Sequence, residues 1–207
     1  MSVPERASAR MKMLVVALRA IVVTLVLTGL VYPFVVTGLA QLLFPSRANG
    51  SLVIVHGREV GSELIGQGFT TAPYFHSRPS ASGYDAANSS ATNLSVTSKK
   101  LRAGAAELAA AYRAANGLAD DVELPADAVS SSASGIDPHI SPDNARLQVA
   151  RVAKARGVAE DRVRAIVDDY TEEPLLGFLG ESRINVLALD LALDRTFGAP
   201  ARVTAAR

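Results

Sequence analysis

The sequence predicts an α+β protein in which a single N-terminal transmembrane helix is followed by one extracytoplasmic mixed α/β domain. Three observations support this fold class: an uncharged apolar run near the N-terminus, a short Val- and Ile-rich run bounded by turn residues, and several segments with apolar residues at helical spacing. We expect a cytoplasmic N-terminal tail at 1–12, a transmembrane helix at 13–45, an extracytoplasmic α+β domain at 46–198 and a C-terminal tail at 199–207.

Composition excludes several classes of protein. The 207 residues carry 21 Lys and Arg against 20 Asp and Glu, a formal net charge of +1, and 49% of them are hydrophobic. A nucleic-acid-binding protein needs a concentrated positive charge, so no nucleic-acid partner is expected. Because the chain has no cysteine, disulfide scaffolds, thiolate zinc sites and cysteine nucleophiles are excluded.

The apolar run is long enough to cross a membrane. Residues 20–44 are 25 consecutive residues without a charge, and at about 1.5 Å per residue such a helix exceeds a hydrocarbon thickness of about 30 Å. A cleaved signal peptide has a shorter apolar core, of about 7 to 15 residues. Residues 1–19 contain four basic residues and one acid, which predicts a cytoplasmic N-terminus and an outer location for the rest of the chain.

Five polar side chains interrupt this apolar helix. Lipid offers hydroxyl and amide groups no hydrogen-bond partners, so we interpret these residues as a face that packs against other membrane helices. The alternative is that the hydroxyl groups bond back to their own helix. Pro33 removes a backbone donor and crowds the carbonyl group of Gly29, which predicts a kink near the middle of the helix. The predicted contact face consists of Thr24, Thr28, Tyr32, Thr37 and Gln41.

Beyond the helix, turn signals and helical periodicity predict a series of short elements. Asn49-Gly50 is a turn signal, and residues 51–61 are typical of a hairpin. Residues 70–98 are rich in small and polar residues without a period, which predicts a long loop. We expect two or three strands within 51–70, helices from Ser98 to Gly117, from Ser141 to Gly157 and through 163–170, and a segment at 184–197 that starts as a strand and finishes as a helix.

Catalytic motifs are absent from the sequence. It has no phosphate-binding loop, no zinc-protease motif and no nucleophile elbow, and its three histidines follow no metal-ligand spacing. Asp137 and His139 stand beside several serines in the sequence, but a hydrolase triad is assembled in space and does not follow from sequence neighbours. Asp before Pro is first a turn signal, however, and His139 directly precedes the helix cap at Ser141. We therefore expect no catalytic residue and no metal ligand.

Short strings distributed along the chain resemble the C subunit of Kdp-type potassium-transporting ATPases, in the order found in that family. The resemblance covers about residues 13–197. Around Thr92 to Ser98 the chain departs from the family pattern, so the local turn is expected to differ. The matching strings include Tyr32-Pro33, Thr37-Gly38-Leu39-Ala40-Gln41, Gly61-Ser62-Glu63-Leu64-Ile65-Gly66-Gln67, Tyr74-Phe75-His76-Ser77-Arg78-Pro79-Ser80-Ala81, Ser134-Gly135-Ile136-Asp137-Pro138-His139-Ile140-Ser141-Pro142 and Ala155-Arg156-Gly157.

The resemblance implies a non-catalytic accessory subunit of an ATP-driven potassium uptake pump in the bacterial inner membrane. Its partners would be a channel-like potassium-binding subunit, an ATP-hydrolysing P-type subunit, a small membrane subunit and the lipid bilayer. The complex would handle ATP and potassium, and no cofactor would be bound by this chain alone. The family is also described as a catalytic chaperone that raises the ATP affinity of the P-type subunit. A membrane-anchored periplasmic hydrolase and a stand-alone binding module are the alternatives.

The same strings supply candidate partner-binding residues in the outer domain. They have side chains able to anchor an interface, and the alternative role for each is a turn or cap that maintains the fold. An outer domain of this kind has two possible routes of action, namely coupling through the membrane helix and capping of the potassium entrance. The candidates are Tyr74, Phe75, Arg78, Asp85, Asn93, Asp137, His139 and Gln148.

Overall fold

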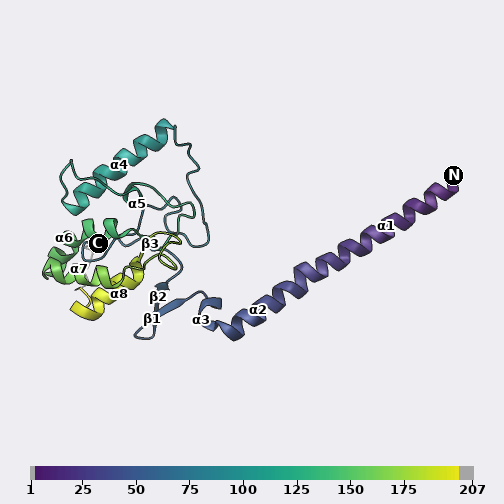
Figure 1. Ribbon diagram of the computed structural model, residues 1–207, viewed down its shortest axis with the longest axis horizontal. Coiled ribbons are helices and arrows are strands. Elements are labelled where there is room, and N and C mark those ends of the chain that lie inside the picture. The colour runs from purple at the N-terminus through teal and green to yellow at the C-terminus, as the bar shows by residue number, and fades with distance from the viewer. Residues whose placement is uncertain (1–2, 201–207) are drawn as a thin grey trace, which may run out of the picture. The chain divides into compact units, whose positions relative to one another are not determined.

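The computed structural model describes residues 3–200 and contains both helices and strands, which confirms the mixed class (Figure 1). The chain divides into two compact units between Ser51 and Leu52. The regular structure described in the first unit is helical, and the second unit combines five helices with four short strands over residues 52–200.

The first unit is a long helix interrupted by one wide turn. Pro33 lies in the first turn of the second half, and the N–H of Tyr32 donates to the carbonyl oxygen of Leu27, five residues back. The disturbance predicted from Pro33 thus takes the form of a π-helical turn. The helical elements are α1 (Val3–Val26), η1 (Leu27–Val31), α2 (Tyr32–Leu43) and the short α3 (Pro45–Ala48).

One segment of this unit could cross a membrane by length and composition. It runs from Arg10 to Leu43, and its most apolar 18-residue window has a mean hydropathy of 2.6 and is not buried within the protein. No second such helix occurs within residues 3–200. A helix with a long apolar window that stays exposed is typical of a membrane-embedded anchor.

The second unit begins with the predicted hairpin. Strands β1 (Leu52–Val55) and β2 (Arg58–Ser62) pair antiparallel, with a bulge at Val53/Ile54. The two connecting residues, His56 and Gly57, both have positive φ, of 51° and 76°. Two-residue hairpin turns with this backbone match the twist of the strands they join.

Two helices of this unit begin and end where the sequence predicts, at Ser98 and Gly117 and at Ser141 and Gly157, whereas the four-residue helix at Ala126–Val129 was not predicted. The hydroxyl oxygens of Ser98 and Ser141 accept backbone N–H groups of the first turns of α4 and α6, and Gly117 and Gly157 end these helices at φ values of 66° and 67°. Such serine caps and left-handed glycines satisfy the free backbone groups of helix ends. The five helices are α4 (Lys99–Asn116), α5 (Ala126–Val129), α6 (Pro142–Arg156), α7 (Glu160–Asp169) and α8 (Val186–Phe197).

Three of these helices enclose the core. Helices α6, α7 and α8 lie together (Figure 1), and a two-stranded ribbon of β3 (His139–Ile140) and β4 (Ile184–Asn185) joins them. Segment 184–197 therefore starts as a strand and finishes as a helix, as predicted. The side chains that form the core are Phe75, Ile140, Ala145, Val149, Val152, Ala153, Val163, Val167, Ile184, Val186, Leu189 and Leu193.

Candidate functional site

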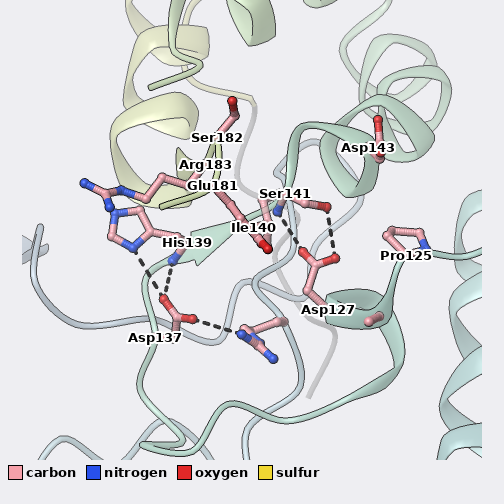
Figure 2. Close-up of a pocket in the computed structure, with 12 residues that line it drawn as sticks. Pro125, Asp127, Asp137, His139, Ile140, Ser141, Asp143, Glu181, Ser182 and Arg183 are labelled. Atoms are coloured by element: carbon pink, nitrogen blue, oxygen red, sulfur yellow. Dashed lines mark hydrogen bonds and ion pairs between the residues drawn. The ribbon is translucent and has the colours of Figure 1, made fainter. Parts of the chain in front are cut away.

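A surface cavity of about 590 Å³ lies in the second unit, where the loop before α6 meets the segment before β4 (Figure 2). Its lining is mostly polar and charged. Three of the predicted site residues, Arg78, Asp137 and His139, contribute to it. The remaining lining residues are Pro125, Ala126, Asp127, Ile140, Ser141, Asp143, Glu181, Ser182 and Arg183.

On one side of this cavity, the carboxylate of Asp137 accepts hydrogen bonds from two other polar residues. One carboxylate oxygen, Oδ1, accepts the backbone N–H of His139 at 3.0 Å and lies 3.4 Å from Nδ1 of the same residue, while Oδ2 accepts Nη1 of Arg78 at 3.1 Å. Burial alone would raise the pKa of Asp137, but the hydrogen bonds from His139 and Arg78 outweigh it and lower the pKa to about 2. The carboxylate is thus charged and fully engaged at neutral pH.

Asp127, from α5, organises the other side of the cavity. Its Oδ2 accepts the backbone N–H of Ser141 at 2.7 Å, and its Oδ1 accepts the Ser141 hydroxyl at 2.9 Å (Figure 2). Oδ2 also accepts Nδ2 of Asn144 at 3.0 Å. The same serine oxygen accepts the N–H of Asn144 as the cap of α6. Asp127 therefore supports the N-terminal cap of α6, the longest of the three helices that enclose the core.

These contacts do not assemble hydrolytic or metal chemistry. The hydroxyl of Ser141 is used as a helix cap, and that of Ser130 donates to the carbonyl oxygen of Ala126 at 2.6 Å. No hydrogen bond joins a serine hydroxyl to the ring of His139 within residues 3–200, as a triad would need. Over the same residues, no three His, Asp or Glu side chains gather in a group that could hold a metal ion.

Two loops are joined behind the Asp137 side of the cavity. The N–H of Gly66 donates to the carbonyl oxygen of Ile136 at 2.7 Å, and a Cβ at Gly66 would overlap the carbonyl oxygen of Asp137. The hydroxyl of Ser80 donates to the carbonyl oxygen of Gly135, which has a φ of 72°. The predicted long loop at 70–98 is thus ordered by pairing with residues 134–137, and Gly66 is required for close approach of two backbones.

A second cluster ties the segment 72–76 to the core. Arg156, with a side chain only 2% exposed, donates from Nε to the carbonyl oxygen of Pro73 at 2.7 Å and from Nη2 to Asp194 at 2.8 Å. Its guanidinium lies 5.0 Å from the ring centroid of Tyr74, and the hydroxyl of Tyr74 donates to Asp194. Burial, with the bond to Asp194, raises the pKa of Tyr74 to about 12. We call residues 72–76 the strap.

Gln148 and Asp190 hold the strap from beneath. Oε1 of Gln148 accepts the N–H of His76 at 2.7 Å, and its Nε2 donates to the carbonyl oxygen of the same residue at 3.1 Å. Oδ1 of Asp190 accepts the N–H of Phe75 at 2.8 Å. Burial raises the pKa of Asp190 well above the ordinary carboxyl value. Within the described residues the strap does not pair with a strand, so these side chains supply the hydrogen-bond partners of its backbone groups.

Two predicted partner contacts are corrected by this arrangement. Phe75 and Gln148 are both completely buried in the second unit, so neither lies on a surface that a partner could contact. Tyr74 is also engaged within the strap. Asp85 accepts the N–H of Ala87 in a local turn, and Asn93, which is exposed, has a positive φ of 49°. Arg78, Asp137 and His139 remain as cavity residues at the surface.

The five predicted contact residues of the apolar helix fall into two groups, with Thr24, Thr28 and Tyr32 before a break in the spacing and Thr37 and Gln41 after it. The hydroxyl of Thr28 donates to the carbonyl oxygen of Thr24 at 2.7 Å, which is the back-bonding alternative. The amide of Gln41 pairs with that of Asn49 at 3.2 and 3.3 Å. Within α2, Thr37 follows Tyr32 by five residues, which places it about 140° further round the helix. These five residues therefore do not form one continuous stripe, and their partner contacts stay a prediction.

Sequence reasoning did not select several residues that organise the two clusters. Asp190 and Asp194 stand four residues apart in a mainly apolar helix, which places both on one face and is a readable signal for buried polar contacts. Arg151 donates to the carbonyl oxygens of Ala72 and Tyr74 at 2.6 and 2.8 Å. No sequence signal identifies Asp127, because its partners at 141 and 144 come from another helix.

The fold and the site together define a class of protein. It has a folded domain attached to one helix that could span a membrane, and the charged side chains of its surface cavity make contacts that maintain the fold. The comparisons identify the family. A family model described as "K+-transporting ATPase, c chain" (KdpC) matches residues 14–195. The chain belongs to this KdpC family.

Curated relatives agree with the family match, and each is named "Potassium-transporting ATPase KdpC subunit". The protein of Myxococcus xanthus is 60% identical over 186 residues, which cover 88% of this chain and 87% of the relative. That of Cereibacter sphaeroides is 51% identical over 178 residues, covering 86% and 94%. That of Mycobacterium tuberculosis is 50% identical over 186 residues, covering 89% and 98%.

Proposed function

We propose that this chain is a non-catalytic accessory subunit of an ATP-driven potassium uptake pump. The observation that carries the proposal is the family match over residues 14–195, which covers most of the membrane-spanning candidate and most of the folded unit. The geometry supports it, because Arg78, Asp137 and Ser141 are engaged in contacts that maintain the fold. The proposed partners are the channel-like potassium-binding subunit, the ATP-hydrolysing P-type subunit and the small membrane subunit.

Assembly is tested by co-purification. With a tag at the C-terminus and gentle detergent extraction of potassium-starved cells, we expect a large polytopic protein and a P-type ATPase to co-purify with this chain in a fixed ratio. Extraction of an untagged strain is the control. A chain that purifies alone, from membranes shown to contain both partners, would contradict the proposal and favour a stand-alone binding module.

The catalytic chaperone role belongs to the same proposal. If the folded unit is extracytoplasmic, its effect on ATP must travel through the membrane-spanning helix as a coupling free energy. The purified assembly should then reach half-maximal ATP hydrolysis at an ATP concentration lower by about fivefold or more than an assembly prepared without this chain, since couplings of this kind start near that size. Equal concentrations in the two preparations would refute this part of the proposal.

The proposed orientation places the N-terminus in the cytoplasm and residues 46–198 outside. Four basic residues against one acid in residues 1–19 support it. Because the chain has no cysteine, a single-cysteine variant reports its own side of the membrane. In intact spheroplasts, a membrane-impermeant maleimide should label Val96→Cys, at a position 83% exposed, but not Ser2→Cys. Labelling of Ser2→Cys alone would reverse the orientation.

A further inference from the structure

A small hairpin projects an apolar tip from the second unit. At its base, Glu172 and Arg183 exchange two backbone hydrogen bonds of 2.8 and 3.0 Å, and their side chains form an ion pair at 3.0 Å. Near the tip, Leu175 and Leu179 exchange two more, of 3.0 and 2.9 Å. Four backbone bonds and an ion pair hold these twelve residues, 172–183, in one conformation.

The turn of this hairpin is strained at a bulky residue. Leu176 has a φ of 56°, and the following Gly177 has a φ of 80°. Glycine, asparagine and aspartate adopt this conformation readily, whereas leucine does so at a cost. A leucine in this turn is therefore unfavourable for the isolated chain. A bulky residue kept at this cost indicates a function for its side chain in contact with another molecule.

The large apolar side chains of the tip are exposed. Leu175, Leu176, Phe178 and Leu179 are 70%, 75%, 74% and 50% exposed. None of the four belongs to the core cluster or to the partly buried side chains packed against it. Contiguous exposed apolar residues with a polar rim mark an interaction surface.

Charge around the tip selects between a lipid surface and a protein. Residues 168–183 contain five acids and one arginine, a net charge of −4. An anionic lipid surface repels such a segment, since peripheral insertion relies on basic flanks. A protein recess with a basic rim attracts it. The base of the hairpin also forms part of the cavity wall, since Glu181 and Arg183 line the same cavity as His139 (Figure 2).

We propose that residues 174–180 are a docking element that inserts Leu176 and Phe178 into an apolar recess with a basic rim on another subunit of the membrane assembly. This inference rests on the proposed function. The rigid base presents the two side chains without a loss of loop entropy on binding, and the neighbouring charged cavity extends the same contact surface.

The test places a photoreactive residue at the tip in the native assembly. Phe178→p-benzoylphenylalanine keeps an aromatic side chain at this position, and the matched control carries the same residue at Val96, which is 83% exposed on a different loop. After irradiation of potassium-starved membranes, we expect a covalent adduct with another subunit at 178, at least about tenfold more abundant than at 96, as for a residue at the centre of an interface. Adding Leu176→Asn, which tolerates the positive φ, or Glu181→Lys should reduce this adduct by about fivefold or more.

The outcomes separate the two proposals. If the assembly co-purifies with the photoreactive chain but 178 gives no subunit adduct beyond that at 96, the docking proposal is overturned and the proposed function stands. An adduct with lipid alone, increased by Glu181→Lys, also overturns it and assigns the tip to the membrane. A wild-type chain that purifies without the pump subunits overturns both.

Discussion

Replacing Arg156 by methionine is expected to lower the free energy of unfolding by about 3–5 kcal/mol. The arginine side chain is 2% exposed, and it bonds to Asp194 and the carbonyl oxygen of Pro73 while it covers the Tyr74 ring. Methionine fills similar volume but leaves a partly buried carboxylate without its cation and a carbonyl oxygen without its donor. Urea unfolding of the full chain in detergent, followed by circular dichroism, measures the change.

The matched control for this substitution is Arg164→Met. Arg164 pairs with Glu160 at 3.8 Å on the exposed side of α7, with both side chains more than half exposed. Such a pair contributes about 0.5 kcal/mol or less. Equal destabilisation by the two substitutions would show that Arg156 does not hold the strap. Arg156→Lys should lie between them, because an ammonium group cannot serve all the acceptors of the planar guanidinium.

Phe75→Ala is expected to cost about 3–5 kcal/mol in the free energy of unfolding. Phe75 is completely buried and belongs to the core cluster enclosed by α6, α7 and α8, although it comes from a segment without regular structure. Its removal leaves a cavity and frees the strap from its apolar anchor. The backbone N–H that bonds to Asp190 is retained in the alanine variant, so the loss measures packing.

Phe178→Ala is the control for Phe75→Ala. Phe178 is 74% exposed at the hairpin tip, so its removal should change stability by about 0.5 kcal/mol or less. The same variant should lose contact with the proposed partner, whereas Phe75→Ala should affect assembly only through unfolding. A large destabilisation by Phe178→Ala would show that the tip is part of the core.

Local signals in the sequence predict most of the elements of this fold. Serine caps and left-handed glycines mark the ends of α4 and α6, and two turn residues mark the β1–β2 hairpin, because these features depend on neighbours within a few residues. Strand β3 was not predicted, since two residues carry no period. The hairpin at 172–183 was missed for a different reason, because its turn places a leucine where glycine or asparagine is typical.

The candidate site was predictable in part. Asp137, His139 and Arg78 lie together at the cavity as the family strings suggest, but the strings do not distinguish a surface residue from a buried one. Phe75 and Gln148 stand in those strings because they hold the strap, and their burial depends on α6 and α8, which follow far along the chain. Contacts between such distant segments leave no periodic pattern in the sequence.

The strap also sets when the domain can finish folding. Phe75 bonds to Asp190 across 115 residues, and Tyr74 bonds to Asp194 across 120. Contacts of this separation form late and slowly, because a long loop must close before they stabilise anything. During synthesis, the strap and its phenylalanine remain uncovered until α8 has emerged, and until then the unit exposes apolar surface to its neighbours. Subunit assembly that requires the closed core must therefore wait for α8.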